Sequence, residues 1–164
     1  KRLPAEVLLD ALDFACDTHE PFQGLGPLGV RAPGVPLGTR AIELPDPNYQ
    51  SVFLDTLGRP KRVIACECER TSEPNLAQTL QLVNGSLINL KLTDNNGRIA
   101  KFLDGDIDNH HAITELYLVT LSRMPSEQER EHCQYIVEDA ANRREGLEDV
   151  LWALCNTREF LFNH

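Results

Sequence analysis

The last third of the chain constrains the fold most, because its apolar residues recur every three or four positions through three successive segments. This spacing places apolar side chains along one face of an α-helix, so each segment predicts a helix with a buried face. The three sets are Ile113, Leu116, Tyr117 and Leu121; Cys133, Ile136, Val137, Ala140 and Ala141; and Leu147, Val150, Leu151, Leu154, Leu161 and Phe162. Short connections at residues 123–125 and around Gly146 favour antiparallel neighbours, which predicts a three-helix bundle.

Capping residues stand near the starts of two of these helices. Ser126 and Glu129 form a capping box, in which the hydroxyl accepts from the N3 amide and the carboxylate accepts from the N-cap amide. Asp108 stands where its carboxylate can cap the helix that runs to Leu121. These signals agree with the periodicity.

Two helices are expected in the first third of the chain. The first runs from Pro4 to about residue 17, because proline is tolerated in a first turn, where its missing N–H has no partner to lose. A short helix follows, opened by Asp46 and Pro47 and closed by Gly58. Its predicted inner face carries Val52, Phe53 and Leu57.

A central helix is predicted between Ser72, which reads as its N-cap, and residue 90. Its buried face carries Leu76, Leu80, Val83, Leu87 and Leu90. Asn84 and Gly85 interrupt it, and a helical glycine costs about 1 kcal/mol against alanine. We therefore expect either a close helix crossing or a break at this point.

Residues 20–47 lack helical periodicity and concentrate proline and glycine. The residues concerned are Pro21, Pro27, Pro33, Pro36, Pro45 and Pro47, with Gly24, Gly26, Gly29, Gly34 and Gly38. A loop of this length inside a folded domain has to pack against other elements to be ordered. The predicted fold is therefore all-α: one domain over residues 1–164, an irregular bundle of about five to six helices with this loop wrapped over it.

Charge and composition narrow the classes of partner. Lys and Arg number 16 against 25 Asp and Glu, for a formal charge of -9, so nucleic acid would meet net repulsion. No apolar run approaches the roughly 20 residues that span a bilayer, so no membrane insertion is expected of this segment, and no targeting signal is seen in it. The five cysteines are an odd number and do not indicate a disulfide framework.

An acidic stretch offers the sharpest metal hypothesis. Asp104, Asp106, Asp108 and Glu115 occupy positions 1, 3, 5 and 12 of a calcium-loop pattern, in which carboxylate oxygens converge on one ion. Asn109 replaces the glycine at position 6 of that pattern, and the alternative is that Asp108 only caps a helix. We expect no cofactor, and a divalent cation is the alternative that this pattern leaves open.

A second candidate lies at residues 66–70, where Cys66 and Cys68 alternate with Glu67 and Glu69 before Arg70. Neighbouring charges can tune a thiolate, but zinc sites pair one cysteine cluster with a second ligand cluster. The histidines at positions 110, 111 and 132 do not provide that second half. Ion pairs or helix capping are therefore the favoured roles of Glu69 and Arg70.

Six strings span nearly the whole chain: RLPAEVLLDAL, GTRAIELPDPNYQSVFLDTLGRPKR, CECERTSEPNLAQTLQLVNG, NGRIAKFL, ITELYLVTLSRMPSEQE and LEDVLWALCNTREFLFNH. Together they resemble the planctomycete-type C-terminal domain of unknown function, which occurs in large exported proteins that often carry c-type cytochrome-like domains. The family has no established activity, so its motif residues bring no assigned roles. They fall here on Cys68, Glu69, Arg70, Asn84, Gly85, Arg123, Glu159, Phe160, Asn163 and His164.

Three functions remain open at this stage. The leading hypothesis is a non-catalytic interaction module of a larger protein of the periplasm or cell envelope, bound to the other domains of that protein or to an envelope partner. The first alternative is an enzyme, or half of one, acting on envelope polysaccharide with a site under residues 20–47. Its candidate carboxylates are Glu43, Asp46, Glu67 and Glu69. The second alternative is structural support for a neighbouring c-type cytochrome-like domain.

Overall fold

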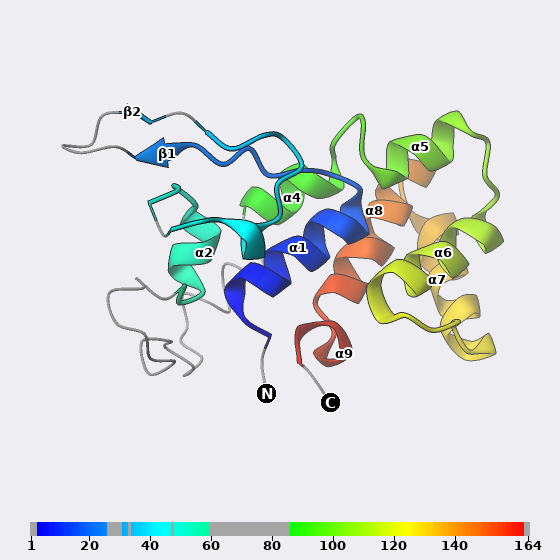
Figure 1. Ribbon diagram of the computed structural model, residues 1–164. Helices are drawn as coiled ribbons and strands as arrows, with labels where there is room; N and C mark the ends of the chain where they lie inside the picture. The colour runs from blue at the N-terminus through cyan, green and yellow to red at the C-terminus, as the bar shows by residue number, and fades with distance from the viewer. Residues whose placement is uncertain (1–2, 26–30, 33, 47, 60–85, 163–164) are drawn as a thin grey trace.

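The computed structural model describes residues 3–25, 31–32, 34–46, 48–59 and 86–162, and nearly all the regular structure in these ranges is helical (Figure 1). The helices are α1 Ala5–Cys16, α2 Val52–Thr56, α4 Ser86–Leu92, α5 Arg98–Asp104, α6 Asn109–Leu121, α7 Glu127–Asp139, α8 Arg143–Cys155 and α9 Arg158–Leu161, with a 3-10 helix, η2, at Ala41–Glu43. Strands β1, Gly24–Leu25, and β2, Arg31–Ala32, pair antiparallel over two residues each. The predicted all-α class is confirmed, and six of the described helices have seven residues or more.

Helices α6, α7 and α8 pack on one another and form the predicted bundle (Figure 1). Helices α7 and α8 approach closely at Gly146, where an added Cβ would lie 2.6 Å from the Val137 Cα and 3.1 Å from the Ala140 Cβ. The prediction that Gly146 belongs to a connection was wrong. It lies inside α8, and its missing side chain lets α7 and α8 touch.

The ends of α7 and α8 are set by local capping. The capping box at the start of α7 is confirmed, since Ser126 Oγ accepts from the Glu129 amide at 3.3 Å and Glu129 Oε2 accepts from the Ser126 amide at 2.8 Å. Helix α7 ends at Asp139, two residues earlier than the apolar pattern suggested. The predicted helix over residues 147–162 divides at Asn156, because Thr157 Oγ accepts from the Phe160 amide and starts α9.

Helix α1 runs through the centre of the fold, within one residue of its predicted bounds at each end. It contacts η2, α2, α4, α5 and α6. Its buried side chains are those of Ala5, Glu6, Leu8, Leu9, Leu12, Ala15 and Cys16. All of them except Glu6 belong to one apolar cluster that also includes buried residues of α2 and of α4 to α9.

The predicted inner face and the predicted start of the short helix over residues 46–58 both need correction. Val52 is 75% exposed, whereas Phe53, Leu54 and Leu57 are buried. Helix α2 begins after Ser51, whose hydroxyl accepts from the Leu54 amide at 3.3 Å, so Asp46 and Pro47 do not open it.

The predicted central helix lies mostly outside the described residues, and α4 is its described end. Leu90 is 68% exposed, while Ile88 and Leu92 are buried. The inward face of α4 is therefore rotated by one to two residues from the face that the apolar pattern predicted. The possible break at residues 84–85 falls outside the described ranges.

The described part of the proline- and glycine-rich loop folds back onto α1. The Asp10 carboxylate accepts from the amides of Ala41 and Ile42, at 2.5 and 3.2 Å, and so caps η2. The Gln50 amide donates to the Gln23 carbonyl at 3.1 Å. Both ends of the loop are thereby held by polar contacts.

Helix α5 was not predicted, and it closes the C-terminal end of α1. Arg98 donates from Nε to the Ala15 carbonyl and from a terminal nitrogen to the Phe14 carbonyl, both at 2.7 Å. These carbonyls belong to the last turn of α1, where the Asp17 amide also donates to the Phe14 carbonyl at 3.3 Å.

The two ends of the described chain lie side by side, since the Leu3 amide donates to the Leu161 carbonyl at 3.1 Å (Figure 1). None of the helices in the described ranges combines the length and apolar character needed to cross a bilayer.

Candidate functional site

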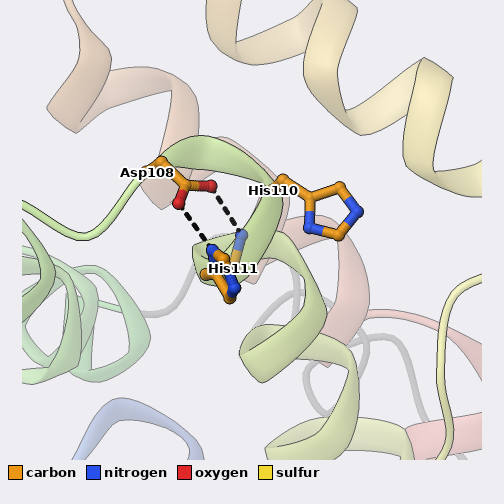
Figure 2. A group of neighbouring side chains, drawn as sticks. All are labelled: Asp108, His110 and His111. Atoms are coloured by element: carbon orange, nitrogen blue, oxygen red, sulfur yellow. Dashed lines mark hydrogen bonds and ion pairs between the residues drawn. The ribbon is translucent and has the colours of Figure 1, made fainter.

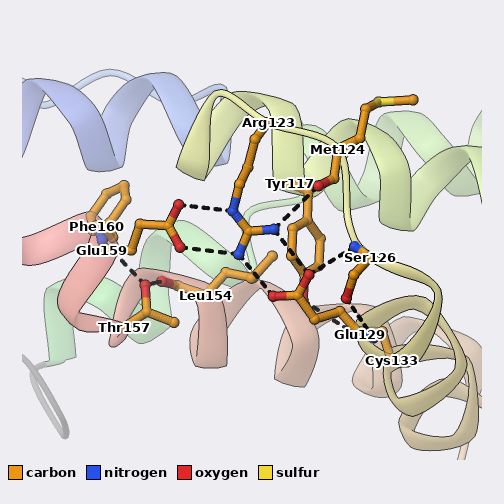
Figure 3. A network of polar contacts seen from close by, with 10 residues as sticks. All are labelled: Tyr117, Arg123, Met124, Ser126, Glu129, Cys133, Leu154, Thr157, Glu159 and Phe160. Atoms are coloured by element: carbon orange, nitrogen blue, oxygen red, sulfur yellow. Dashed lines mark hydrogen bonds and ion pairs between the residues drawn. The ribbon is translucent and has the colours of Figure 1, made fainter.

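Arg123 is the centre of a network of polar contacts (Figure 3). It follows Ser122, which ends α6 in the left-handed conformation with φ of 55°. Its guanidinium donates twice to Glu159, at 2.8 and 3.0 Å, and twice to Glu129, at 2.9 and 2.8 Å. It also lies 5.4 Å from the ring centroid of Tyr117. We call this set of four residues the Arg123 clamp, and it joins α6, α7 and α9.

The electrostatics of the Arg123 clamp favour permanent charges over proton transfer. The guanidinium hydrogen bonds and the Ser126 amide lower the pKa of Glu129 to about 2, and both carboxylates raise the pKa of Arg123. Burial and the nearby Cys133 thiol raise the pKa of Tyr117. These groups keep one protonation state near neutral pH, whereas a general acid or base works best with a pKa near the operating pH.

Replacing Arg123 with methionine is expected to lower stability by about 1–2 kcal/mol, because two paired carboxylates lose their donor at a half-exposed site. The melting temperature should fall by roughly 2–8 °C. Because the pKa of Glu129 is depressed when folded, its contribution is present above the unfolded pKa and disappears as pH falls from there towards 2. Thermal melts at pH 7 and pH 3 should thus differ less for Arg123→Met than for the wild type.

Arg158→Met is the matched control, because Arg158 lies exposed on the same helix α9. It should leave the melting temperature within about 2 °C of wild type, as exposed substitutions do. Equal effects of the two variants would contradict a special role for the Arg123 clamp.

Arg123 and Glu159 are motif residues suggested by the family resemblance, and they make contact. Phe160 is buried in the core beside them. The other motif candidates, Cys68, Glu69, Arg70, Asn84, Gly85, Asn163 and His164, lie outside the described residues. The described motif residues thus have a structural explanation: they fix α9 to the bundle.

One group of three side chains that suit a metal comes together within the described ranges, namely Asp108, His110 and His111 (Figure 2). Carboxylate and imidazole ligands suit Zn²⁺ and similar ions. However, Asp108 already accepts from the His111 amide at 3.0 Å and contacts His111 Nδ1 at 2.5 Å, which lowers the pKa of its carboxyl. The Arg130 guanidinium contacts His110 Nε2, so a positive charge already lies beside the His110 imidazole.

The calcium-like residues have separate surroundings. Asp108 caps α6, as the alternative interpretation expected. Glu115 pairs with Arg98 at 2.8 Å, while Asp104 ends α5 and Asp106 follows it in the loop with φ of 50°. Among the described residues these four do not form a group of converging ligands.

The cysteines of the described ranges are buried thiols. Burial raises the pKa of Cys16 to about 12 and also raises the pKa values of Cys133 and Cys155. A nucleophilic cysteine needs a lowered pKa and access to solvent. These three side chains therefore act as small apolar core residues.

A hollow of about 620 Å³ lies between α1 and residues 38–40 of the loop; we call it the α1 hollow. Asp10, Asp13 and Asp17 reach it from α1. Burial raises the pKa of Asp10 against the lowering effect of the Ala41 and Ile42 amides. Three carboxylates thus share one concave surface, which sequence reasoning did not anticipate.

A buried ion pair lies behind this surface. Lys91 of α4 is 6% exposed, and its Nζ lies 2.5 Å from Asp13 Oδ1 and 2.9 Å from Glu20 Oε2. Burial alone lowers the pKa of Lys91, but the two carboxylates outweigh it and the pKa is raised. Lys91 is therefore a fixed positive charge that ties α4 to α1.

The carboxylates proposed for an enzymatic site under the loop bind nearby backbone amides where they are described. Glu43 accepts from the Arg40 amide at 3.1 Å, and Asp46 accepts from the Asn48 amide at 2.7 Å. Both contacts are exposed, and neither residue lines the α1 hollow. Glu67 and Glu69 fall outside the described residues.

No protein-family model, curated protein or solved structure matches the chain. The family resemblance of the sequence motifs therefore stays a prediction.

Proposed function

We propose that this chain is a non-catalytic helical interaction module that binds other domains of a larger exported protein. The observation that carries the proposal is that the best-placed polar groups of the described chain are engaged in holding helices together. Arg123 joins three helices, Lys91 joins α4 to α1, and Asp10 caps η2. Such fixed contacts suit a scaffold, because they commit these three described residues to structural pairs rather than to proton transfer.

Exposed apolar side chains supply a contact surface for this module. Val52 of α2 and Leu90 of α4 are 75% and 68% exposed, and both line a hollow of about 580 Å³. Its other described lining residues are the apolar Phe53 and Leu87 and the polar Glu20, Gln50, Ser51, Asp55 and Ser86. Apolar patches on a protein surface commonly mark contacts with other proteins. We call this surface the α2–α4 patch, and its proposed occupant is another domain of the same parent protein.

The setting follows from the family resemblance alone. It implies a protein of the periplasm or cell envelope, and a c-type cytochrome-like domain is one neighbour that the module would support. A support role needs no haem ligand from this chain. It needs only a stable surface at a fixed orientation, which a rigid helical bundle provides.

The test is association in trans. The chain and the remainder of its parent protein are purified separately and mixed in an isothermal titration calorimeter, where a saturable 1:1 heat is expected. Val52→Glu and Leu90→Glu should each weaken binding by about tenfold or more, as a charge in a buried apolar contact does. Tyr135→Glu, at an exposed position on α7, is the control and should leave the affinity unchanged. Absence of association at about 100 μM, an affinity of roughly 5.5 kcal/mol, would refute the proposal.

A further inference from the structure

Residues 93–97 join α4 to α5 through a turn that contains two consecutive asparagines. The Gly97 amide donates to the Asp94 carbonyl at 3.1 Å, and the Asn96 amide donates to the Asp94 carboxylate at 2.8 Å. Asn95 and Asn96 are both exposed. The turn therefore presents two carboxamides to water, each followed by a different residue.

The two asparagines differ in their contacts and in the residue that follows them. The Arg144 guanidinium donates to Asn95 Oδ1 at 3.0 Å, and Asn95 precedes another asparagine. The Asn96 side chain has no hydrogen-bond partner among the described residues, and it precedes Gly97. A glycine has no Cβ to keep a neighbouring side chain away from its amide nitrogen. The Asn96 carboxamide can therefore turn towards the Gly97 nitrogen.

This arrangement permits an intramolecular reaction, because the two reacting groups are held in one short segment. The Gly97 nitrogen attacks the Asn96 Cγ, water carries the amide proton to the departing nitrogen, and ammonia leaves a cyclic succinimide. Water then opens the ring at either carbonyl. Cleavage of the N–Cγ bond gives aspartate. Cleavage of the bond between the nitrogen and the main-chain carbonyl carbon gives isoaspartate, whose backbone passes through the former side chain.

The hydrogen bonds of the turn set how far folding slows this reaction. The Gly97 amide has to leave the Asp94 carbonyl, and the Asn96 amide has to leave the Asp94 carboxylate. Each such bond changes an equilibrium by about twofold to tenfold, so the two together slow the reaction by roughly fourfold to a hundredfold. A turn can open in this way without global unfolding.

The backbone that follows the reacting bond is closely packed on α1. An added Cβ at Gly97 would lie 3.1 Å from the Cys16 carbonyl oxygen. The next residue, Arg98, donates to the Ala15 and Phe14 carbonyls at the end of α1. An extra backbone carbon immediately before Gly97 has to displace these contacts.

We propose that Asn96 is a site of spontaneous deamidation in the folded protein, and that its isoaspartate product loosens α5 from α1. The modification needs only water, and it releases ammonia without any change of oxidation state. It makes the junction between α1 and α5 a part of the molecule that changes with age. The inference does not depend on the α2–α4 patch or its partner.

Mass spectrometry after timed incubation in mildly alkaline buffer tests the first part of the proposal. Trypsin releases residues 92–98 as one peptide, and fragmentation locates the carboxylate that replaces an amide. Asn96 should convert roughly fourfold to a hundredfold more slowly in the folded protein than in urea, while Asn95 stays unmodified. Conversion of both asparagines at one rate, or a folded-state rate below this range, overturns the proposal.

Asp94→Ala tests the role of the turn. It removes the carboxylate that holds the Asn96 amide and keeps the carbonyl that holds the Gly97 amide. Conversion of Asn96 in the folded variant should be about twofold to tenfold faster than in the wild type. Asp104→Ala, at an exposed position at the other end of α5, is the control and should leave the rate unchanged. Equal rates in the two variants contradict the role given to the turn.

Limited proteolysis tests the second part, with Asn84→Gln as the background because Asn84 also precedes a glycine. Ion exchange separates the aged protein, which has gained a negative charge, and fragmentation measures its isoaspartate content. Trypsin should cleave the native aged fraction after Arg98 about tenfold faster than the unmodified protein, because the junction opens more often. Asn96→Asp carries the same charge on a normal backbone and should resist trypsin like the unmodified protein. Equal resistance of the aged fraction, or equal sensitivity of Asn96→Asp, overturns the proposed loosening.

Discussion

Replacing Lys91 with methionine is expected to destabilise the fold by about 3–5 kcal/mol, because removing one partner of a buried ion pair leaves the others uncompensated. Asp13 and Glu20 would then face each other in a site where Lys91 is 6% exposed. The pKa of Lys91 is raised in the folded state, so its contribution is fully present at neutral pH and is lost only as pH rises through that raised value. Urea denaturation at pH 7 measures the loss.

The matched variant combines Lys91→Met with Asp13→Asn and Glu20→Gln. It removes all three charges and should recover part of the stability, because neutral groups tolerate burial better than unpaired carboxylates. A single Lys91→Met variant as stable as wild type would show that the ion pair contributes nothing net. The same result would show that α4 is held to α1 by apolar contacts alone.

Gly146→Ala is expected to destabilise the protein by about 1–3 kcal/mol or more, although alanine is the better helix former by about 1 kcal/mol. The added Cβ would lie 2.6 Å from the Val137 Cα and 3.1 Å from the Val137 carbonyl oxygen. Both contacts are with backbone, so α7 has to move away from α8. Thermal and urea denaturation should both register the loss.

Asp149→Ala is the control for this prediction, because Asp149 lies exposed on the same helix. Alanine there should be neutral or slightly stabilising by propensity. If Gly146→Ala behaved like the control, the close contact between α7 and α8 would not be needed for their packing.

Helical periodicity predicted the α6–α8 bundle well, because apolar residues that recur every three or four positions over several turns fit an α-helix and not a strand. The C-terminal helices were found from spacing, and Ser126 with Glu129 marked a start correctly. Gly146 was misassigned, because a glycine that ends a helix and a glycine that lets two helices touch look the same in one sequence. The neighbouring chain, not the local sequence, decides between them.

The faces of the short helices were harder to predict. Over the five residues of α2, spacing alone fits more than one face, and Val52 was placed inward although it is exposed. Periodicity distinguishes faces reliably only over several turns.

The polar sites depended on contacts that sequence spacing does not encode. Lys91 lies 78 positions from Asp13 in the sequence, so only the fold brings the two side chains together. The one available sequence signal was that Lys91 is a charged residue between two leucines, Leu90 and Leu92. Arg123 and Glu159 were singled out by resemblance alone, without a predicted partner. The two carboxylates that Arg123 binds come from different helices, and only the packing brings them together.

The central position of α1 affects how the chain folds during synthesis. The burial of its apolar face is complete only when it also contacts α5 and α6, which begin at Arg98 and Asn109. At a translation rate of about 5–20 residues per second, α1 waits on the order of 5–20 s for those partners to leave the ribosome. During that interval α1 can contact η2, α2 and α4 but not α5 or α6, so its apolar face stays incompletely covered and chaperone binding is expected at the nascent α1.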